Sequence, residues 1–354
     1  LEGYQASGDK ELRRVAREIL DYVLRDMTSP EGGYYSATDA DSIGPKGHRE
    51  EGYYFTWTPK ELSAVLGPQQ AKTIAHHYGV TPGGNFEGRS ILHTPREKAA
   101  SAAALKLSVN ELDREIDAAR GLLLAERNKR PAPIRDEKIQ VSWNGLMLAA
   151  MARGARVLGD PRYHDNAIAA ARFLLEKLYE GGRLKHSYKD GRTTTIAFAE
   201  DYAFLASGLI ELFEATHVAQ WLNHALRVMN QLEQHHARKG AGGYFRTAHD
   251  AEQLLAREMQ QHDGAVPAAS SVALMNLLKL SSLTTDDRWS QRAEDTLKAF
   301  SPLLSRAPWA LEEMLIGLDY FTDTPKEVLL VVPKDSSPDS EDFRNLEAVL
   351  KRGF

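Results

Sequence analysis

The strongest constraint in this sequence is an alternation between two kinds of helical segment. In the first kind almost every position is apolar, as expected of a helix that is buried on every side. In the second kind a single apolar stripe follows the i, i+3, i+4, i+7 spacing, as expected of a helix with one buried face and one wet face. The all-apolar segments are residues 142–158, 201–213, 270–283 and 308–320, and the clearest striped segment is 11–27. The alternation predicts one ring of helices enclosed by another.

The connections between these segments alternate as well. Each striped segment runs into a long Gly-rich loop, and each all-apolar segment ends in a tight turn. The resulting helical hairpin repeats about every 60 residues, which is within the range for stacked helical units. The Gly pairs are Gly32-Gly33, Gly181-Gly182 and Gly242-Gly243. With this alternation all inner helices point the same way, and the long loops gather on the face that holds their N-termini. We therefore predict an all-α fold, an (α/α)6 toroid of six hairpins.

The expected helices follow from the same pattern. Capping boxes mark two of the starts, Thr58 with Glu61 and Ser108 with Glu111. The outer helices are expected near 11–27, 108–129, 161–179, 218–237 and 287–304, and the inner ones near 58–78, 142–158, 200–215, 268–283 and 308–320.

We expect the toroid to occupy residues 1–325, with an irregular insertion near 36–57. It is expected to be incomplete at its N-terminus, because residues 1–7 resemble the end of a helix that begins earlier. A small α/β appendix at 326–354 should follow, with a strand at 327–333 and a helix at 340–351.

Charge and composition exclude several function classes. The formal net charge is -5 and no basic run occurs, so neither a nucleic acid nor an anionic membrane surface is the expected partner. No apolar stretch is long enough to span a membrane. Cysteine is absent, which excludes thiol catalysis, disulfides and cysteine-based zinc sites within this chain, and a cytoplasmic location is predicted.

We expect no cofactor and no metal. Asp39, Asp41, Gly44 and Glu50 half match a calcium loop, but Ile43 stands at a ligand position and no helix pair flanks the segment, so a turn is favoured.

Acidic residues cluster on the long-loop face. Aligned inner helices would bring Asp39, Asp41, Asp136, Glu200, Asp201, His262 and Asp263 to the rim of one central cavity. Sugar chemistry uses such sites, because paired carboxylates serve as acid and base while aromatic rings stack on sugar faces. Capping of a helix N-terminus explains Glu200 and Asp201 equally well. Asp263 is the best single candidate, since it lies in a Gly-containing loop with no obvious capping role. Its neighbour His262 is a candidate acid–base residue because it lies beside this carboxylate.

Several motifs, in chain order, resemble the toroid portion of the YyaL-type, spermatogenesis-associated protein 20 family. They are Gly32-Gly33-Tyr34-Tyr35 with Asp39-Ala40-Asp41-Ser42, Tyr53-Tyr54-Phe55-Thr56-Trp57, Asn85-Phe86-Glu87-Gly88, Asp136-Glu137-Lys138, Ser142-Trp143-Asn144-Gly145, Asp201-Tyr202-Ala203, Gly242-Gly243-Tyr244-Phe245 and Asp263-Gly264-Ala265-Val266-Pro267. The resemblance implies a six-hairpin glycosidase-like toroid, similar in architecture to N-acylglucosamine 2-epimerase. It also implies a thioredoxin-like domain in the full-length parent, and it names no substrate or reaction.

Two hypotheses follow. The first is a sugar-active toroid, either an epimerase-like isomerase or a glycosidase-like hydrolase, that takes a small-molecule sugar ligand. In it Asp263, Asp201 and His262 are the candidate catalytic residues, Asp39, Asp41, Asp136 and Asn144 position hydroxyls, and Trp143, Tyr202 and Tyr34 stack on the ring. The second is a non-catalytic toroid that binds a glycan or a protein and serves the thioredoxin-like domain. Fold resemblance alone does not separate them.

Overall fold

The structure is a computed structural model that describes residues 1–252 and 255–323, together with residues 331, 340, 341, 343, 345, 346 and 349. The chain divides into two compact units, and each is described by itself. The first holds Leu1–Ser36 and Glu137–Phe354, and the second holds Ala37–Asp136. The predicted appendix at 326–354 lies, apart from isolated positions, outside the described residues.

The first unit contains most of the predicted helices. They are α1 (Glu2–Ser7), α2 (Lys10–Tyr22) continued by a π-helical turn (Val23–Met27), α7 (Val141–Leu158), α8 (Pro161–Lys177), α9 (Ala199–Thr216), α10 (Ala219–His236), α11 (Ala269–Thr284), α12 (Asp287–Arg306), a 3₁₀ turn (Pro308–Ala310) and α13 (Glu312–Thr322). Asp9, Asp160 and Asp286 each accept a backbone N–H in the first turn of α2, α8 and α12, so an aspartate cap begins three of the outer helices.

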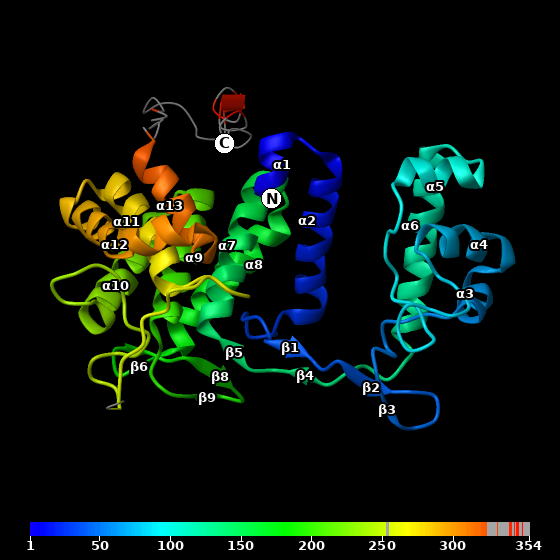
Figure 1. The fold of residues 1–354 in the computed structure, drawn as a ribbon, viewed down its shortest axis with the longest axis horizontal. Helices are drawn as coiled ribbons and strands as arrows, with labels where there is room; N and C mark the ends of the chain where they lie inside the picture. The colour runs from blue at the N-terminus through cyan, green and yellow to red at the C-terminus, as the bar shows by residue number, and fades with distance from the viewer. Residues whose placement is uncertain are drawn as a thin grey trace. The chain divides into compact units, whose positions relative to one another are not determined.

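These helices pack as the alternation predicts. The inner helices α7, α9, α11 and α13 contact one another in chain order, and the outer helices α8, α10 and α12 lie against them, as the green-to-orange part of Figure 1 shows. The fold is therefore all-α, of the α/α toroid type. Helix α9 is the most deeply enclosed, with twelve buried residues along its length.

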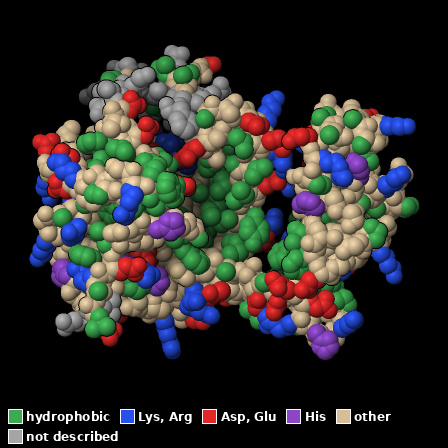
Figure 2. Space-filling model, viewed as in Figure 1, with side chains coloured by type: hydrophobic (Ala, Val, Ile, Leu, Met, Phe, Trp, Pro, Cys, Tyr) green, Lys and Arg blue, Asp and Glu red, His purple; other side chains and the backbone are tan. Residues whose placement is uncertain are grey.

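Two inner helices differ from the expectation of burial on every side. Helix α7 exposes Trp143 and leaves Leu146 and Met147 half-buried, and α13 exposes Ile316 and Phe321. Trp143 and the two half-buried residues all lie in the first two turns of α7, so this part of the helix has a face that its neighbours do not cover. Figure 2 shows hydrophobic side chains exposed on the surface of the molecule.

The apolar stripe of α2 also differs from the prediction. Leu20 and Val23 are buried, but Leu12, Val15 and Ile19 are exposed. Within the first unit α2 packs against α7 mainly through its C-terminal half, where Gly154 of α7 lets Leu20 approach closely. The stripe is therefore buried only in its second half.

Short strands lie in the loops that precede the inner helices. Strands β6 (Tyr179–Glu180) and β7 (Arg183–Leu184) form a hairpin, and β5 (Ile139–Gln140), β8 (Ser187–Lys189) and β9 (Arg192–Thr193) form an antiparallel sheet in the order β5-β8-β9. Gly181 and Gly182 turn the β6–β7 hairpin with positive φ angles of 59° and 77°, a conformation that disfavours residues with a Cβ. This sheet precedes two inner helices. Strand β5 runs directly into α7, and β9 is followed by α9.

The second unit has a core of its own. Its elements are β1 (Ala37–Thr38), β2 (Asp41–Ile43), β3 (Arg49–Glu51), α3 (Pro59–Leu66), α4 (Pro68–His77), α5 (Lys98–Leu105), α6 (Val109–Arg127) and β4 (Arg135–Asp136). Both predicted capping boxes are present, at the starts of α3 and α6. The helix expected near 108–129 forms as α6, whereas the single helix expected near 58–78 is two helices, α3 and α4, because the chain turns at Gly67, which has a positive φ of 75°. Helices α3, α4 and α6 pack with one another around Trp57, Leu62, Ile74 and Leu112. In the part of the chain that is described, no helix has the length and apolar character needed to cross a membrane.

Candidate functional site

Asp201 lies in the first turn of α9, in the first unit. Its side chain is fully buried at the start of α9. Oδ1 accepts the backbone N–H of Ser142, in the first turn of α7, at 2.9 Å, and Oδ2 accepts the backbone N–H of Phe198 at 2.8 Å. Oδ2 also accepts a hydrogen bond from Nδ1 of His186 at 2.8 Å. One carboxylate therefore joins the starts of two inner helices to the loop that carries His186.

His186 is a functional candidate that the sequence analysis missed. Its ring stands edge-on to Phe198 with centroids 5.1 Å apart, and its side chain is 24% exposed. The hydrogen bond to Asp201 raises the pKa of His186 above its usual value, against the opposing effect of burial. A carboxylate on Nδ1 fixes the ring orientation and leaves Nε2 as the atom that exchanges protons. No local motif marks this histidine, because the pair is separated by fifteen residues and needs the β5-β8 pairing to form.

Glu200 and Arg246 flank the His186–Asp201 pair. Arg246 donates from Nε to Oε1 of Glu200 at 3.0 Å, and its guanidinium lies 4.8 Å from the centroid of the Phe198 ring. Among the described residues no group hydrogen-bonds to Oε2 of Glu200, although this atom is buried. Burial, followed by the charge of Asp201, raises the pKa of Glu200. The pKa values of His186 and Glu200, the two titratable groups beside Asp201, are therefore both raised.

Asp263 has a structural role that the sequence analysis did not foresee. Oδ1 accepts the backbone N–H of Ala268, the residue that precedes α11, at 2.7 Å, and Oδ2 accepts the backbone N–H of Glu313 in the first turn of α13 at 2.9 Å. The expectation that Asp263 has no capping role is wrong, because it caps the starts of two inner helices at once. Its neighbour His262 is exposed, and its backbone carbonyl oxygen accepts a hydrogen bond from Nε2 of Gln260 at 3.0 Å.

The predicted stacking and hydroxyl-binding residues of the first unit divide by exposure. Trp143 is 42% exposed, whereas Tyr202 is fully buried and Tyr34 is buried with its hydroxyl donating to Asn166 at 2.7 Å. Asn144 is also buried: its Oδ1 accepts the N–H of Tyr34 at 2.7 Å, and its Nδ2 donates to the carbonyl oxygen of Tyr34 at 3.0 Å. Trp143 is therefore the one of these four that a ligand can reach.

Asp39, Asp41 and Asp136 belong to the second unit. Asp39 forms an ion pair with Arg49, and its Oδ1 accepts the backbone N–H of Asp41 at 3.1 Å. That backbone hydrogen bond, together with Arg49, lowers the pKa of Asp39. Asp136 pairs with Ala37 in the β1-β4 ladder. These contacts all lie within residues 37–136, so the site built around Asp201 consists of first-unit residues alone.

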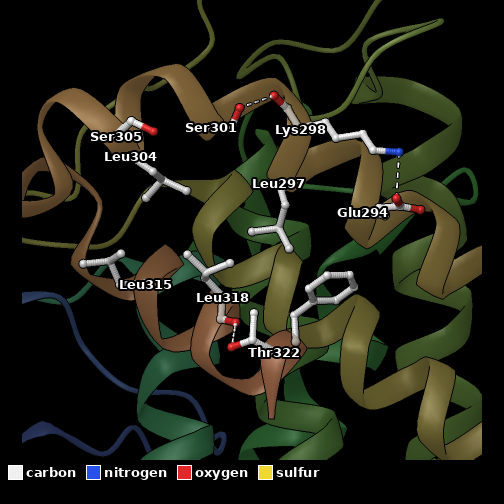
Figure 3. A pocket seen from close by; sticks show the side chains of 10 residues that line it. Glu294, Leu297, Lys298, Ser301, Leu304, Ser305, Leu315, Leu318 and Thr322 are labelled. Carbon is white, nitrogen blue, oxygen red and sulfur yellow. Dashed lines mark hydrogen bonds and ion pairs between the residues drawn. The ribbon is translucent and has the colours of Figure 1, made fainter.

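A pocket of about 440 Å³ lies elsewhere in the first unit, between α12 and α13. Figure 3 shows Leu297, Leu304, Leu315 and Leu318 around it, with the ion pair of Lys298 and Glu294 at one side. The lining is mostly apolar and the charged pair is exposed, so this pocket offers no acid–base chemistry. Within the described residues no group of three or more His, Asp or Glu is arranged to hold a metal ion.

Comparison with known proteins identifies relatives of the chain. Human spermatogenesis-associated protein 20 is 33% identical to it over 360 residues, which cover 93% of this chain, and the mouse protein is 32% identical over the same span. The chain is a homologue of spermatogenesis-associated protein 20. It spans about half the length of these relatives, 46% in both. No protein-family model matches the chain.

Solved structures with a similar arrangement are sugar epimerases and glycoside hydrolases. A cellobiose 2-epimerase from Bacillus thermoamylovorans has a TM-score of 0.39 and 18% identity, with 46% of this chain and 44% of that one covered. A GH76 alpha-mannanase from Bacteroides thetaiotaomicron has a TM-score of 0.44 and 11% identity, with 99% of this chain and 84% of that one covered.

Proposed function

We propose that the first unit is a carbohydrate-active toroid in which His186, oriented by Asp201, is the acid–base group. The observation that carries this proposal is the 2.8 Å hydrogen bond between Nδ1 of a partly exposed histidine and a fully buried carboxylate. Such an arrangement fixes the tautomer and leaves Nε2 free to take or give a proton near neutral pH. Trp143, exposed at the start of α7, is the proposed stacking surface for a sugar ring.

The hydrogen bonding favours histidine over the paired carboxylates that the sequence suggested. Hydrolysis by two carboxylates needs both groups to reach the scissile bond. Both oxygens of Asp201 and both oxygens of Asp263 accept backbone N–H groups at helix starts, so neither carboxylate is free to do so. Asp201 is therefore a positioning residue in this proposal, and Asp263 holds α11 and α13 in place.

The reaction class that fits is epimerisation or isomerisation of an open-chain sugar. His186 takes the proton from the carbon next to the carbonyl group, and the electron pair moves onto the carbonyl oxygen to form an enediolate. Return of a proton to the other face of that carbon completes the epimerisation. Water is the source of that second proton in this proposal, because Glu200 is ion-paired to Arg246 and its Oε2 atom is buried. Arg246, ion-paired to Glu200, is placed to contact sugar hydroxyls.

Proton exchange tests this proposal even when the product of the reaction is not identified. A panel of aldoses and aldose-ended disaccharides is incubated with the protein in D₂O, and loss of the C2–H signal is followed by NMR. We expect exchange with at least one sugar, and a decrease of about 10² to 10⁴-fold in the His186→Gln variant, the usual contribution of a general acid–base group.

The matched control is His164→Gln, which changes an exposed histidine on α8 and should leave exchange unaltered. Equal exchange by the wild type and His186→Gln contradicts the assignment of His186. Sugar binding without exchange across the whole panel contradicts the enzyme proposal and supports the non-catalytic toroid.

A further inference from the structure

A second pocket, of about 210 Å³, opens among α7, α9, α11 and α13 of the first unit, with Glu2 of α1 at its edge. Its described lining contains none of the residues around Asp201, so the pocket is separate from the proposed acid–base site. The volume corresponds to about seven water molecules at roughly 30 Å³ each, so the pocket suits a ligand of about six or seven non-hydrogen atoms.

The cations that line this pocket are already paired with carboxylates. Arg153 donates from Nη2 to Glu211 at 2.6 Å and from Nη1 to Glu2. Lys279 donates from Nζ to Glu211 and to Glu214, at 2.9 Å in each case. Although burial opposes the change, Lys279 and Arg153 lower the pKa of Glu211 to about 2. Both cations therefore have partners within the protein, and neither of them calls for an anionic ligand.

The charges around the pocket leave one negative charge in excess. The acids are Glu2, Glu211, Glu214 and Glu313, and the bases that face them are Arg153, Arg156 and Lys279. Glu313 is the acid without a counter-charge. Its side chain is half-buried in the first turn of α13, and no described residue forms a hydrogen bond or an ion pair with its carboxylate. Burial, followed by the charge of Asp263, raises the pKa of Glu313, as expected of a carboxylate that lacks a cationic partner.

Asn276 supplies a second acceptor without a donor. Its side chain is 1% exposed and lines the same pocket. Nδ2 donates to the carbonyl oxygen of Ala203 at 2.7 Å and lies 3.8 Å from Sδ of Met229, so the amide nitrogen is used. In the described part of the chain nothing donates to Oδ1 of Asn276. Since buried polar groups are satisfied by a partner or by water, a ligand with N–H donors fits this wall of the pocket.

The rest of the pocket is lined mainly by apolar side chains. They are Ile210, Val272, Met275 and Ile316, together with the ring of Tyr320. A bare metal ion gains nothing from such a wall, and it needs more oxygen or nitrogen ligands than one carboxylate and one amide supply. An organic cation with an apolar part can use both sides of the pocket.

We propose that this pocket binds a short primary alkylammonium ion, whose ammonium group donates to the Glu313 carboxylate and to Oδ1 of Asn276. An ammonium group has three N–H donors and no acceptor, which matches two acceptors that lack donors. The alkyl chain lies against the apolar side chains. The site is read out by binding alone, so its failure and the failure of the proposed sugar chemistry at His186 are distinguishable.

Pentylammonium and 1-pentanol form a matched pair of probes, since they share the alkyl chain and differ in the charged group. Binding of each to the whole chain is measured by isothermal titration calorimetry at low ionic strength and about pH 8, where the amine is protonated and carboxylates are ionised. We expect saturable binding of pentylammonium, and binding of 1-pentanol weaker by about tenfold or more. Equal affinity for the two probes, or no saturable binding of pentylammonium, overturns the proposal.

Two variants of neighbouring acids complete the test. Glu313→Gln keeps the size of the side chain and an acceptor oxygen but removes the charge. Pentylammonium affinity should then fall about 10- to 100-fold, the usual range for loss of a hydrogen bond to a charged group.

Glu312→Gln is the matched control, because it removes an exposed acid at the adjacent position that does not line the pocket. It should leave pentylammonium affinity unchanged. Equal affinity of the wild type and Glu313→Gln, or equal losses in the two variants, overturns the proposal. Circular dichroism checks folding, and the comparison of the two probes on the wild type decides the matter even if a variant fails to fold.

Discussion

Asn144 illustrates how a polar side chain on a buried helix can serve structure. Its amide bonds the N–H and the carbonyl oxygen of Tyr34 and also the carbonyl oxygen of Gln140, at 2.7, 3.0 and 2.8 Å. It thereby clamps the Gly32-Gly33-Tyr34 loop to the start of α7. The sequence analysis assigned Asn144 to sugar hydroxyls, but its hydrogen-bond partners are backbone groups of its own chain.

Replacement of Asn144 by alanine leaves these buried backbone groups without partners. A lost partner costs about 1 to 3 kcal/mol for each buried group, so we expect the free energy of unfolding to fall by about 3 kcal/mol. Urea unfolding measures the change. Asn223→Ala, at an exposed position of α10, is the control and should change it by no more than about 0.5 kcal/mol. Equal effects of the two substitutions would contradict the clamp.

His186 gives a prediction about pH. Because its pKa is higher in the folded protein than the ordinary value of 6.5, the Asp201 interaction stabilises the fold fully below about pH 6.5. This contribution is lost as the pH rises through the folded-state pKa. We therefore expect the free energy of unfolding to decrease over that window in the wild type and to change less in His186→Gln. A pH titration of the ring by NMR that gives a pKa at or below 6.5 would contradict it.

At the scale of elements, two glycines let α7 and α9 approach closely. A Cβ on Gly145 would lie 2.4 Å from the carbonyl carbon of Phe204, and a Cβ on Gly208 would lie 2.7 Å from the carbonyl oxygen of Gly145. Such contacts are too short for any side chain, so the two helices pack backbone against backbone. This packing also brings Ser142 of α7 within reach of the Asp201 carboxylate.

Gly145→Ala should force α7 and α9 apart. We expect a loss of about 3 kcal/mol in the free energy of unfolding, at the upper end of the cost of overpacking. Gly121→Ala on α6 is the opposite case, because nothing lies within 4 Å of its added Cβ. There alanine should stabilise the helix by about 0.5 to 1 kcal/mol through its higher helix propensity. Thermal unfolding measures both, and a neutral Gly145→Ala would show that the helices are not in such close contact.

Asp201 and Asp263 act at the element scale as well, since each ties two inner helices together at their N-termini. The sequence placed both acids on the correct face, because helix direction follows from the alternation of long and short connections. Which backbone N–H groups these two carboxylates bind depends on long-range contacts, and the local sequence pattern does not contain them. Asp263 meets Glu313 across fifty residues, and Asp201 meets Ser142 across fifty-nine.

At the scale of the whole molecule, residues 37–136 form a unit within the chain. Its two ends are neighbours, because Ala37 pairs with Asp136 and Thr38 with Arg135 in an antiparallel ladder. On the other side of this boundary, Ser36 donates a hydrogen bond to the carbonyl oxygen of Lys138 at 2.6 Å. The sequence showed an irregular segment near 36–57, but the return of the chain at residue 136 depends on this long-range pairing.

Residues 37–136 produced alone should fold. Their separate core supplies the buried apolar surface that a unit of this length needs. We expect a helical circular dichroism spectrum and a cooperative thermal transition. As the control, a chain in which Ser36 is joined directly to Glu137 should keep its own cooperative transition. A broad, non-cooperative melt of the fragment would show that its core is not self-sufficient. The thioredoxin-like domain of the full-length parent and the cytoplasmic location stay predictions.

The sequence by itself determined the helical alternation, the capped starts of α3 and α6, and the positions of Asp201 and Asp263 at the starts of inner helices. These are properties of burial periodicity and local hydrogen bonding, which short stretches of chain specify. Only the tertiary structure decided what those acids bind. A carboxylate's role depends on which donors meet it in space, so Asp201 and Asp263 became helix caps, and His186, unmarked in the sequence, became the exposed partner of Asp201.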